Sequence, residues 1–282
     1  TLYVHGYSNY GGLNLSKKLF VIGPGYFLGE NPNTQVNPAS AKIVSDSLNF
    51  YPGSEGSLVM GMEINFYVGI NVSNVALKRN YINFYVSGNI IILNSNLINV
   101  VISQNYIVNS GSSCILLGAN CSNIFIFNNY LYSSIPNYTV FGSHPGISNI
   151  FLANNVIYGN IYLSTSVIKN NILRDGNFFG SSNSIYNNIA NSTQFGSSNG
   201  NLSNVDMSTV FVGTGSSDGK WKLNTGSPAI GAGENGVDCG MFGGNEPYVL
   251  SGIPSIPSIY YFDAPLEGGN QLPVKIKVKS NK

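Results

Sequence analysis

The distribution of carboxylates gives the first indication of what chemistry this chain can perform. No Asp or Glu occurs between Glu63 and Asp175, although this stretch is the most regular part of the sequence. Glycoside hydrolysis needs two paired carboxylates, and a calcium-dependent reaction needs several that cluster around the ion. The sequence therefore argues against both mechanisms along the middle of the chain.

Side chains for a metal-free elimination on an acidic polysaccharide are nevertheless present. Such a lyase needs a base, such as Tyr, Lys or His, and a group that neutralises the uronate. The candidates are Lys78, Arg79, Tyr81, Tyr138 and His144. The plainer interpretation is that Lys78 and Arg79 face outward as solubilising charges and that His144 lies in a turn.

Two rows of outward-facing residues could bind a ligand without catalysis. One row contains Val101, Phe125 and Phe151, and the other contains Tyr81, Tyr106 and Tyr130. Aromatic rows stack on sugar rings or dock a partner, because exposed apolar strips are uncommon on monomers. The alternative, which we favour, is that loops leaving the regular structure cover these rows or that the rings pack at turns.

These residues belong to an internal repeat. Segments that align without gaps start at Asn74, Asn99, Asn123 and Asn149, at intervals of about 25 residues. Apolar residues alternate within each segment, which predicts β-strands with one buried face. The predicted core columns are Val75, Val100, Ile124 and Ile150, and Leu77, Ile102, Ile126 and Leu152.

A second Asn recurs in each repeat where the strand must bend. Asn tolerates a left-handed backbone, and its amide can hydrogen-bond to the same amide on the next coil. The predicted structural ladder consists of Asn80, Asn105, Asn129, Asn155, Asn171 and Asn188.

A repeat of this length predicts an all-β fold, a right-handed parallel β-helix in which each coil contributes three short strands. A propeller blade needs about 40 residues, and a leucine-rich repeat needs a fixed Leu pattern, so neither fits. We expect one domain, with a β-helix whose first coils are irregular over residues 1–200. Closing coils, a cap and an edge strand should occupy 201–282.

The predicted edge strand is recognised by its lysines. From Pro273 to Lys279 Lys alternates with β-branched residues, as in an edge strand that is protected from aggregation. The functional alternative is a basic docking strand for a partner or for acidic glycans.

Two stretches carry a family resemblance. The segment Asp218–Gly233, followed by Val237–Gly244, resembles the closing motif of secreted bacterial right-handed parallel β-helix repeat proteins, particularly those of the Bacteroidetes type. Leu15–Gly25 resembles their first coil. The resemblance implies this fold and secretion, but these proteins include lyases, hydrolases and adhesins, so it does not give a function. We expect a secreted or cell-surface protein whose signal peptide has been removed.

Composition excludes other classes of function. Only 9% of the residues are charged and the net charge is +1, which gives no reason to expect a nucleic acid or an anionic membrane as partner. No apolar run is long enough to span a membrane, and neither a cofactor motif nor metal-type cysteine spacing is present. Whether Cys114 and Cys121 form a disulfide stays open.

We therefore expect a non-catalytic structural or adhesive β-helix protein that binds a polysaccharide or another surface protein. The alternative is a metal-independent polysaccharide lyase or a related carbohydrate-active enzyme. The two differ in a property of the site: an enzyme must gather its base and its charge neutraliser in one cleft, whereas a binding protein needs only an uncovered face. The sequence leaves the oligomeric state open.

Overall fold

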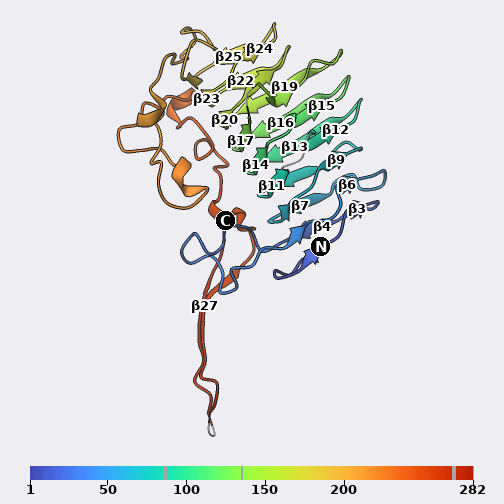
Figure 1. Cartoon of the computed structure of the whole chain (residues 1–282), viewed down its shortest axis with the longest axis vertical. Helices are drawn as coiled ribbons and strands as arrows, with labels where there is room; N and C mark the ends of the chain where they lie inside the picture. Colours follow the sequence, from blue (N-terminus) through green and yellow to red (C-terminus); the bar gives the residue numbers. More distant parts are fainter. Residues whose placement is uncertain (85–87, 135, 269–270, 282) are drawn as a thin grey trace.

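The chain folds into three parallel sheets that wind around a common core (Figure 1). The computed structural model describes residues 1–84, 88–134, 136–268 and 271–281. Each successive coil adds one strand to each sheet, apart from the last, whose described strands join the first two sheets only, and successive strands of a sheet pair in parallel. The predicted all-β parallel β-helix is confirmed.

Strands are short, as expected for a solenoid. The first sheet contains β1 (Leu2–Tyr3), β4 (Phe20–Ile22), β7 (Leu58–Met60), β10 (Ala76–Lys78), β13 (Ile98–Ser103), β16 (Ser122–Phe127), β19 (Ser148–Ala153), β22 (Val167–Lys169) and β25 (Ser184–Tyr186). The second contains β2 (Asn9–Tyr10), β5 (Lys42–Ile43), β8 (Glu63–Ile64), β11 (Tyr81–Phe84), β14 (Tyr106–Asn109), β17 (Tyr130–Ser133), β20 (Val156–Tyr158), β23 (Ile172–Asp175) and β26 (Ile189–Ala190). The third contains β3 (Leu13–Leu15), β6 (Leu48–Phe50), β9 (Val68–Ile70), β12 (Ile91–Leu93), β15 (Ser113–Leu117), β18 (Tyr138–Phe141), β21 (Asn160–Tyr162) and β24 (Phe178–Phe179).

The repeat register aligns identical positions of successive coils. Ile102 pairs with Ile126, which pairs in turn with Leu152, and all three side chains are fully buried. The other predicted core columns are buried in the same way. Because each apolar side chain packs on the coils above and below, the core is continuous along the solenoid.

The Asn ladder runs through the interior at the bend between the first and second sheets. The side-chain oxygen of Asn129 accepts from the backbone N–H and the side-chain amide of Asn105, at 2.9 and 3.1 Å. The same pair of bonds links each ladder member to the next, and Asn201 extends the ladder by one coil. The left-handed residue is not the ladder Asn but the residue before it; Asn128, for example, has a φ of 54°.

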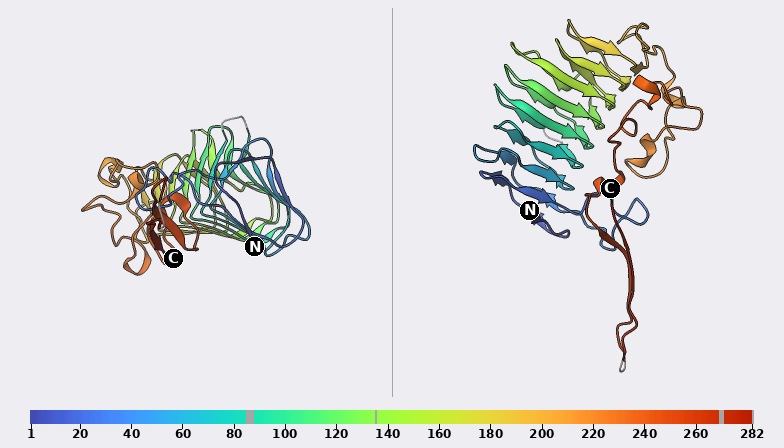
Figure 2. Two further views of the ribbon diagram at one scale, coloured as in Figure 1. Left: turned by 90° about the horizontal axis from the view of Figure 1, so that it is seen from below. Right: turned by 180° about the vertical axis from the view of Figure 1, so that it is seen from behind.

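The chain after β26 first caps the solenoid and then turns back along it. Phe195 packs into the core at the last coil, and the backbone N–H of Leu202 donates to Asn188 O at 2.8 Å. From about residue 205 the chain runs back along the outer face of the second sheet (Figures 1 and 2). Its short 3-10 turns are η1 (Met207–Thr209), η2 (Gly219–Trp221), η3 (Glu234–Gly236) and η4 (Leu250–Gly252).

A buried carboxylate fixes this returning segment to an early loop. Asp218 is fully buried and accepts hydrogen bonds from Asn31, Ser216, Tyr248 and the backbone N–H of Ser251, at 2.6–3.2 Å. A buried charge is tolerated when donors surround it in this way. The Asp of the closing motif therefore has a structural role.

The predicted edge strand forms a separate hairpin. β27 (Ser258–Asp263) and β28 (Lys275–Lys279) pair antiparallel and join none of the three parallel sheets. Figures 1 and 2 show that this ribbon extends past the end of the solenoid that carries β1. The segment 201–282 thus contains the returning segment along the second sheet and a projecting ribbon, as well as part of a cap.

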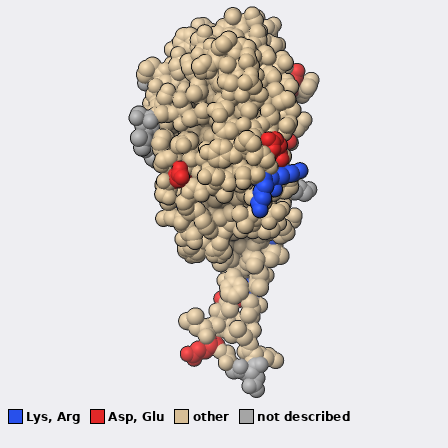
Figure 3. Space-filling view, turned by 90° about the vertical axis from the view of Figure 1, so that its right-hand side faces the viewer, with Lys and Arg blue, Asp and Glu red and all other residues tan. Residues whose placement is uncertain are grey.

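Charged side chains are sparse on the molecular surface. The face of the solenoid on the right of Figure 1 is almost free of charged side chains (Figure 3). Within the described residues, no helix has the length and apolar character required to cross a membrane. Cys114, Cys121 and Cys239 are all buried and free, so the Cys114–Cys121 disulfide is not formed.

Candidate functional site

The outer face of the first sheet carries one of the two predicted aromatic rows. Val101, Phe125 and Phe151 are register neighbours on adjacent strands, and the two phenylalanine rings lie 6.2 Å apart. The side chain of Phe125 is exposed, whereas Val101 and Phe151 are half-buried. This row is therefore not covered by loops, contrary to the interpretation that we favoured.

A groove follows this row along the solenoid. A hollow of about 360 Å³ lies between the outer face of the first sheet and the returning segment at 234–246. A second hollow, of about 590 Å³, shares Phe127 and Glu246 with the first and extends to Phe20 on β4. We call the two together the first-sheet groove. From β4 to β22 it crosses seven strands, roughly 29 Å at the spacing of paired strands.

One wall of the groove is held by a column of left-handed residues. These residues precede the ladder Asn in each coil, and their backbone turns their side chains outward toward the returning segment. Asn128 donates to Met241 O and Gly243 O at 2.9 and 2.7 Å. Side-chain hydrogen bonds to backbone carbonyls recur along what we call the anchoring column, except at Asn170, which accepts from Glu234 N–H. The column consists of Arg79, Gln104, Asn128, Asn154, Asn170 and Asn187.

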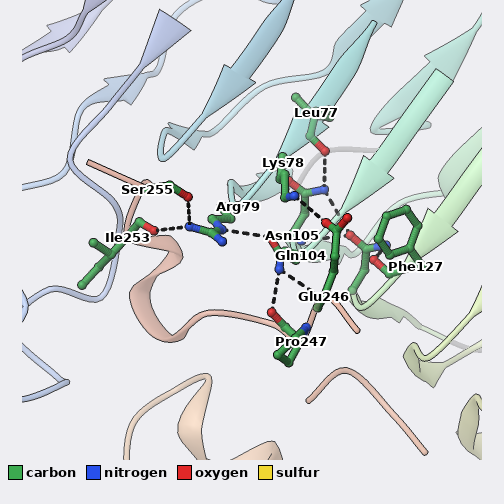
Figure 4. Close-up of polar contacts among 11 residues, drawn as sticks. Leu77, Lys78, Arg79, Gln104, Asn105, Phe127, Glu246, Pro247, Ile253 and Ser255 are labelled. Carbon is green, nitrogen blue, oxygen red and sulfur yellow. Dashed lines mark hydrogen bonds and ion pairs between the residues drawn. The ribbon is translucent and has the colours of Figure 1, made fainter. Parts of the chain in front are cut away.

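Arg79 and Gln104 form the part of the anchoring column shown in Figure 4. The guanidinium of Arg79 donates to Gln104 Oε1, Ile253 O and Ser255 Oγ at 2.8–3.0 Å. Gln104 in turn donates to the carbonyls of Glu246 and Pro247. Arg79 is only 5% exposed, and burial lowers its pKa from the usual value. The interpretation of Arg79 as an outward solubilising charge is therefore wrong.

Two ion pairs connect the first sheet to the wall. Lys78 Nζ lies 2.6 Å from Glu246 Oε2, and Lys169 Nζ lies 2.6 Å from Glu234 Oε2. Partial burial, the largest single effect, would lower the pKa of Lys169, but hydrogen bonds and charge interactions with Glu234 and Tyr186 together outweigh it, and the pKa is raised. The ammonium of Lys169 also lies 5.2 Å from the centre of the Phe151 ring. Each cation of the groove is thus neutralised by a carboxylate.

A buried hydroxyl lies next to Lys78 beneath the surface of the groove. Ser103 is the register neighbour of Lys78, and both residues line the second hollow. Among the described residues, Ser103 Oγ is one of two buried side-chain polar atoms that have no hydrogen-bond partner. Such a group is costly to leave unpaired, but Ser103 is fully buried, so its hydroxyl is not open to a ligand in the groove.

The second predicted row is covered by other parts of the chain. Tyr106 and Tyr130 are buried and stack at 4.5 Å, and the indole of Trp221 stacks on Tyr130 at 4.8 Å. The ring of Phe27 lies 4.8 Å from that of Tyr81. Here the favoured interpretation, in which loops cover the row, agrees with the structure, and these tyrosines do not form an open binding face.

The candidates for lyase chemistry are not gathered in one cleft. Lys78 ends a strand of the first sheet, and Arg79 is occupied by the anchoring contacts. Tyr138 lies on β18 of the third sheet, where it packs against Phe141 at 4.6 Å. His144 is exposed in the turn that follows β18. The structure therefore places neither Tyr138 nor His144 beside Lys78 or Arg79.

Sequence reasoning missed three residues that shape the groove. Lys169, Glu234 and Glu246 line it, but the two carboxylates belong to the closing segment, and nothing in the sequence indicates the path of that segment over the coils.

The described residues hold no cluster of His, Cys, Asp or Glu that could bind a metal ion. Comparison of the chain with protein-family models, with curated proteins and with solved structures found no match. The geometry of the groove therefore has to carry the functional proposal.

Proposed function

We propose that the first-sheet groove binds one chain of a neutral polysaccharide. The observation that carries this proposal is the phenylalanine pair Phe125 and Phe151 on an uncovered sheet face, next to the ion-paired Lys169. Apolar faces of sugar rings stack on such rings, while amides, carboxylates and ammonium groups hydrogen-bond to their hydroxyls. The groove supplies these polar groups on both sides of the rings.

The shape of the groove favours an extended ligand. Its two hollows are open and adjoin each other along the stacked strands, and neither forms an enclosed pocket for a single sugar. A polymer that lies across successive strands meets a similar set of side chains at each coil. We therefore infer that several sugar units contact the groove at once.

The charge of the groove favours a neutral polymer over a polyuronate. Its two lysines are both paired with glutamates, so no cation is free to neutralise an added carboxylate. Binding a uronate would require breaking an ion pair or placing like charges together, which costs free energy. We expect neutral glycans to bind more tightly than acidic ones.

Binding without cleavage is the activity that we propose for this groove. Of the predicted lyase residues, Lys78, Tyr81 and Tyr138 lie on three different sheets. Each glutamate of the groove is held by a lysine rather than placed as a proton donor. We further propose that the protein acts outside the cell, as a secreted or surface adhesin. The resemblance of its closing motif to secreted bacterial β-helix repeat proteins supports this location.

The test compares two exposed aromatic residues on different faces. The purified full-length chain and its variants are titrated with soluble neutral and uronate polysaccharides, while the absorbance of unsaturated uronate is followed in the same samples. Phe125 on the first sheet and Phe179 on the third are 38% and 40% exposed, so Phe179→Ala is a matched control. We expect Phe125→Ala to weaken neutral-glycan binding roughly 2- to 10-fold, the usual scale for one stacked ring.

Three results would contradict the proposal. Equal binding by the Phe125→Ala and Phe179→Ala variants would place the ligand elsewhere. Failure of every neutral glycan to bind would refute the proposed function. Rising absorbance with a uronate polymer would show that the chain is a lyase.

A further inference from the structure

A group of cations and aromatic rings lies where the returning segment crosses the later strands of the second sheet (Figure 1). The guanidinium carbon of Arg174, on β23, lies 4.2 Å from the centre of the Trp221 ring. The ammonium of Lys220 lies 5.2 Å from the same ring. Two cations thus share one aromatic ring, and their mutual repulsion favours an anion beside them.

Neither of these cations forms an ion pair with a carboxylate of the described residues. The ion pairs found there are those of Lys42, Lys78 and Lys169. Asp175, which follows Arg174 in the chain, accepts instead from the N–H of Gly176 at 2.8 Å and from the amide of Asn191 at 3.5 Å. The positive charge here is therefore not neutralised, in contrast to that of the first-sheet groove.

The hydrogen-bonding capacity of Arg174 is also incompletely used. Its Nε is one of two buried side-chain polar atoms that have no partner among the described residues, while the side chain as a whole is only half-buried. Burial raises the pKa of Tyr130, and the interaction of its hydroxyl with Arg174 acts against this rise. A hydroxyl and aromatic rings stabilise a cation without cancelling its charge, so Arg174 can still accept a charged partner.

Two tyrosines continue this surface along the second sheet. Tyr132 and Tyr158 are register neighbours, and their rings stack 5.0 Å apart at an interplanar angle of 18°. The guanidinium of Arg174 lies 5.5 Å from the Tyr158 ring. Because both half-buried rings start from paired positions and are nearly parallel, their hydroxyls end side by side. Phenol hydroxyls donate hydrogen bonds to anionic oxygens.

We propose that these residues bind a carboxylate of an acidic polysaccharide. The site, which we call the second-sheet patch, consists of Tyr132, Tyr158, Arg174, Lys220 and Trp221. Its cations supply the charge that a uronate needs, and its tyrosines contact the sugar that carries the carboxylate. The patch lies on a different sheet from the first-sheet groove, so a neutral and an acidic polymer bind at separate faces. One protein would then join two kinds of polysaccharide.

The test follows the fluorescence of Trp221, the single tryptophan of the chain, while the full-length protein is titrated with a soluble polyuronate. The methyl ester of the same polymer is the matched ligand, since it keeps the sugar backbone and loses the charge. We expect a saturable change with the polyuronate and none with the ester. Added salt should weaken the binding, because partly exposed charges are screened.

Variants assign the response to the patch. Arg174→Gln should weaken polyuronate binding at least about 10-fold in calorimetry, the scale of a lost charge-assisted hydrogen bond. Lys17→Gln removes an exposed positive charge from the first coil and should leave the binding unchanged. Tyr158→Phe keeps the ring and the fold, and should weaken the binding roughly 2- to 10-fold. Phe125→Ala, in the first-sheet groove, should have no effect, so a failure of the groove proposal would be seen separately.

Four results would overturn the proposal. They are a polyuronate that leaves the fluorescence of Trp221 unchanged, an equal response to the methyl ester, a folded Arg174→Gln variant that binds like the wild type, and unchanged binding by Tyr158→Phe. Circular dichroism shows whether each variant is folded. If Arg174→Gln does not fold, Tyr158→Phe decides.

Discussion

We predict that the Asn ladder contributes several kcal/mol to the free energy of unfolding. Asn129 is fully buried and takes part in five hydrogen bonds through its side chain. Its oxygen accepts two from Asn105, and the two amide hydrogens are shared among three acceptors, Ile102 O, Phe127 O and Asn155 Oδ1. The variant Asn129→Ala removes all five and leaves buried backbone groups without partners.

The expected loss follows from these contacts. At about 1 kcal/mol for each intramolecular hydrogen bond, and with some of the freed groups finding water, the free energy of unfolding should fall by about 3–5 kcal/mol. This is a large part of the total for a typical domain, about 5–15 kcal/mol. Urea unfolding followed by far-ultraviolet circular dichroism measures the loss.

A second amide provides the control. The amide of Asn94 donates to Asn71 Oδ1 at 2.6 Å, but this pair lies on the exposed surface. Asn94→Ala should cost less than about 1 kcal/mol, because water replaces the lost bond. If Asn129→Ala cost as little as Asn94→Ala, the ladder would not stabilise the solenoid and the reasoning would be refuted.

Three further predictions concern the returning segment and the thiols. Asp218→Ala should destabilise the chain by about 2–4 kcal/mol, because four donors lose their acceptor. The fluorescence of Trp221, on the same segment, should report the loosening of that segment. An unchanged urea midpoint would exclude this role. Burial raises the pKa of Tyr106 from 10.0 to about 12, so its contribution to stability is complete below pH 10 and is lost as the pH rises to 12. The urea midpoint should therefore fall over this range, and it should fall less steeply in the Tyr106→Phe variant. An equal slope in both proteins would contradict the prediction. Burial also raises the pKa of all three thiols, that of Cys239 to about 12, so a thiol reagent should react only after unfolding; fast labelling of the native chain would disagree.

The β-helix itself could be predicted because each coil repeats the same local rules. Columns such as Ile102, Ile126 and Leu152 alternate with outward residues, and the ladder Asn recurs at a fixed place in each coil. Contacts between neighbouring coils join residues about one repeat apart, so their partners are visible in an alignment of the sequence with itself.

The groove could not be predicted because its wall comes from outside the repeat. Asn128 binds carbonyls 113 and 115 residues later, and Lys78 pairs with Glu246 across 168 residues. Nothing in the sequence of Arg79 or Gln104 distinguishes an anchoring residue from an exposed one, since both occupy the same left-handed position that Asn fills in later coils. The paths of the returning segment and of the early loop that carries Phe27 decide which aromatic row is covered and which stays open.

The ribbon formed by β27 and β28 could also be predicted only in part. Alternation of Lys with Ile and Val correctly predicts a strand at Lys275–Lys279, because it separates a polar from an apolar face. Its partner, β27, is separated from it by 11 residues, 264–274, and carries no such pattern. No pattern in the sequence therefore predicts that the two strands pair with each other, apart from the parallel sheets.

A crystal structure of the chain with a neutral oligosaccharide tests the central claim most directly. The account predicts density for a sugar chain that crosses successive strands of the first sheet, with rings stacked on Phe125 and Phe151 and hydroxyls near Lys169 and Glu234. Sugar density on another face, or a saturated crystal with an empty first-sheet groove, would contradict it.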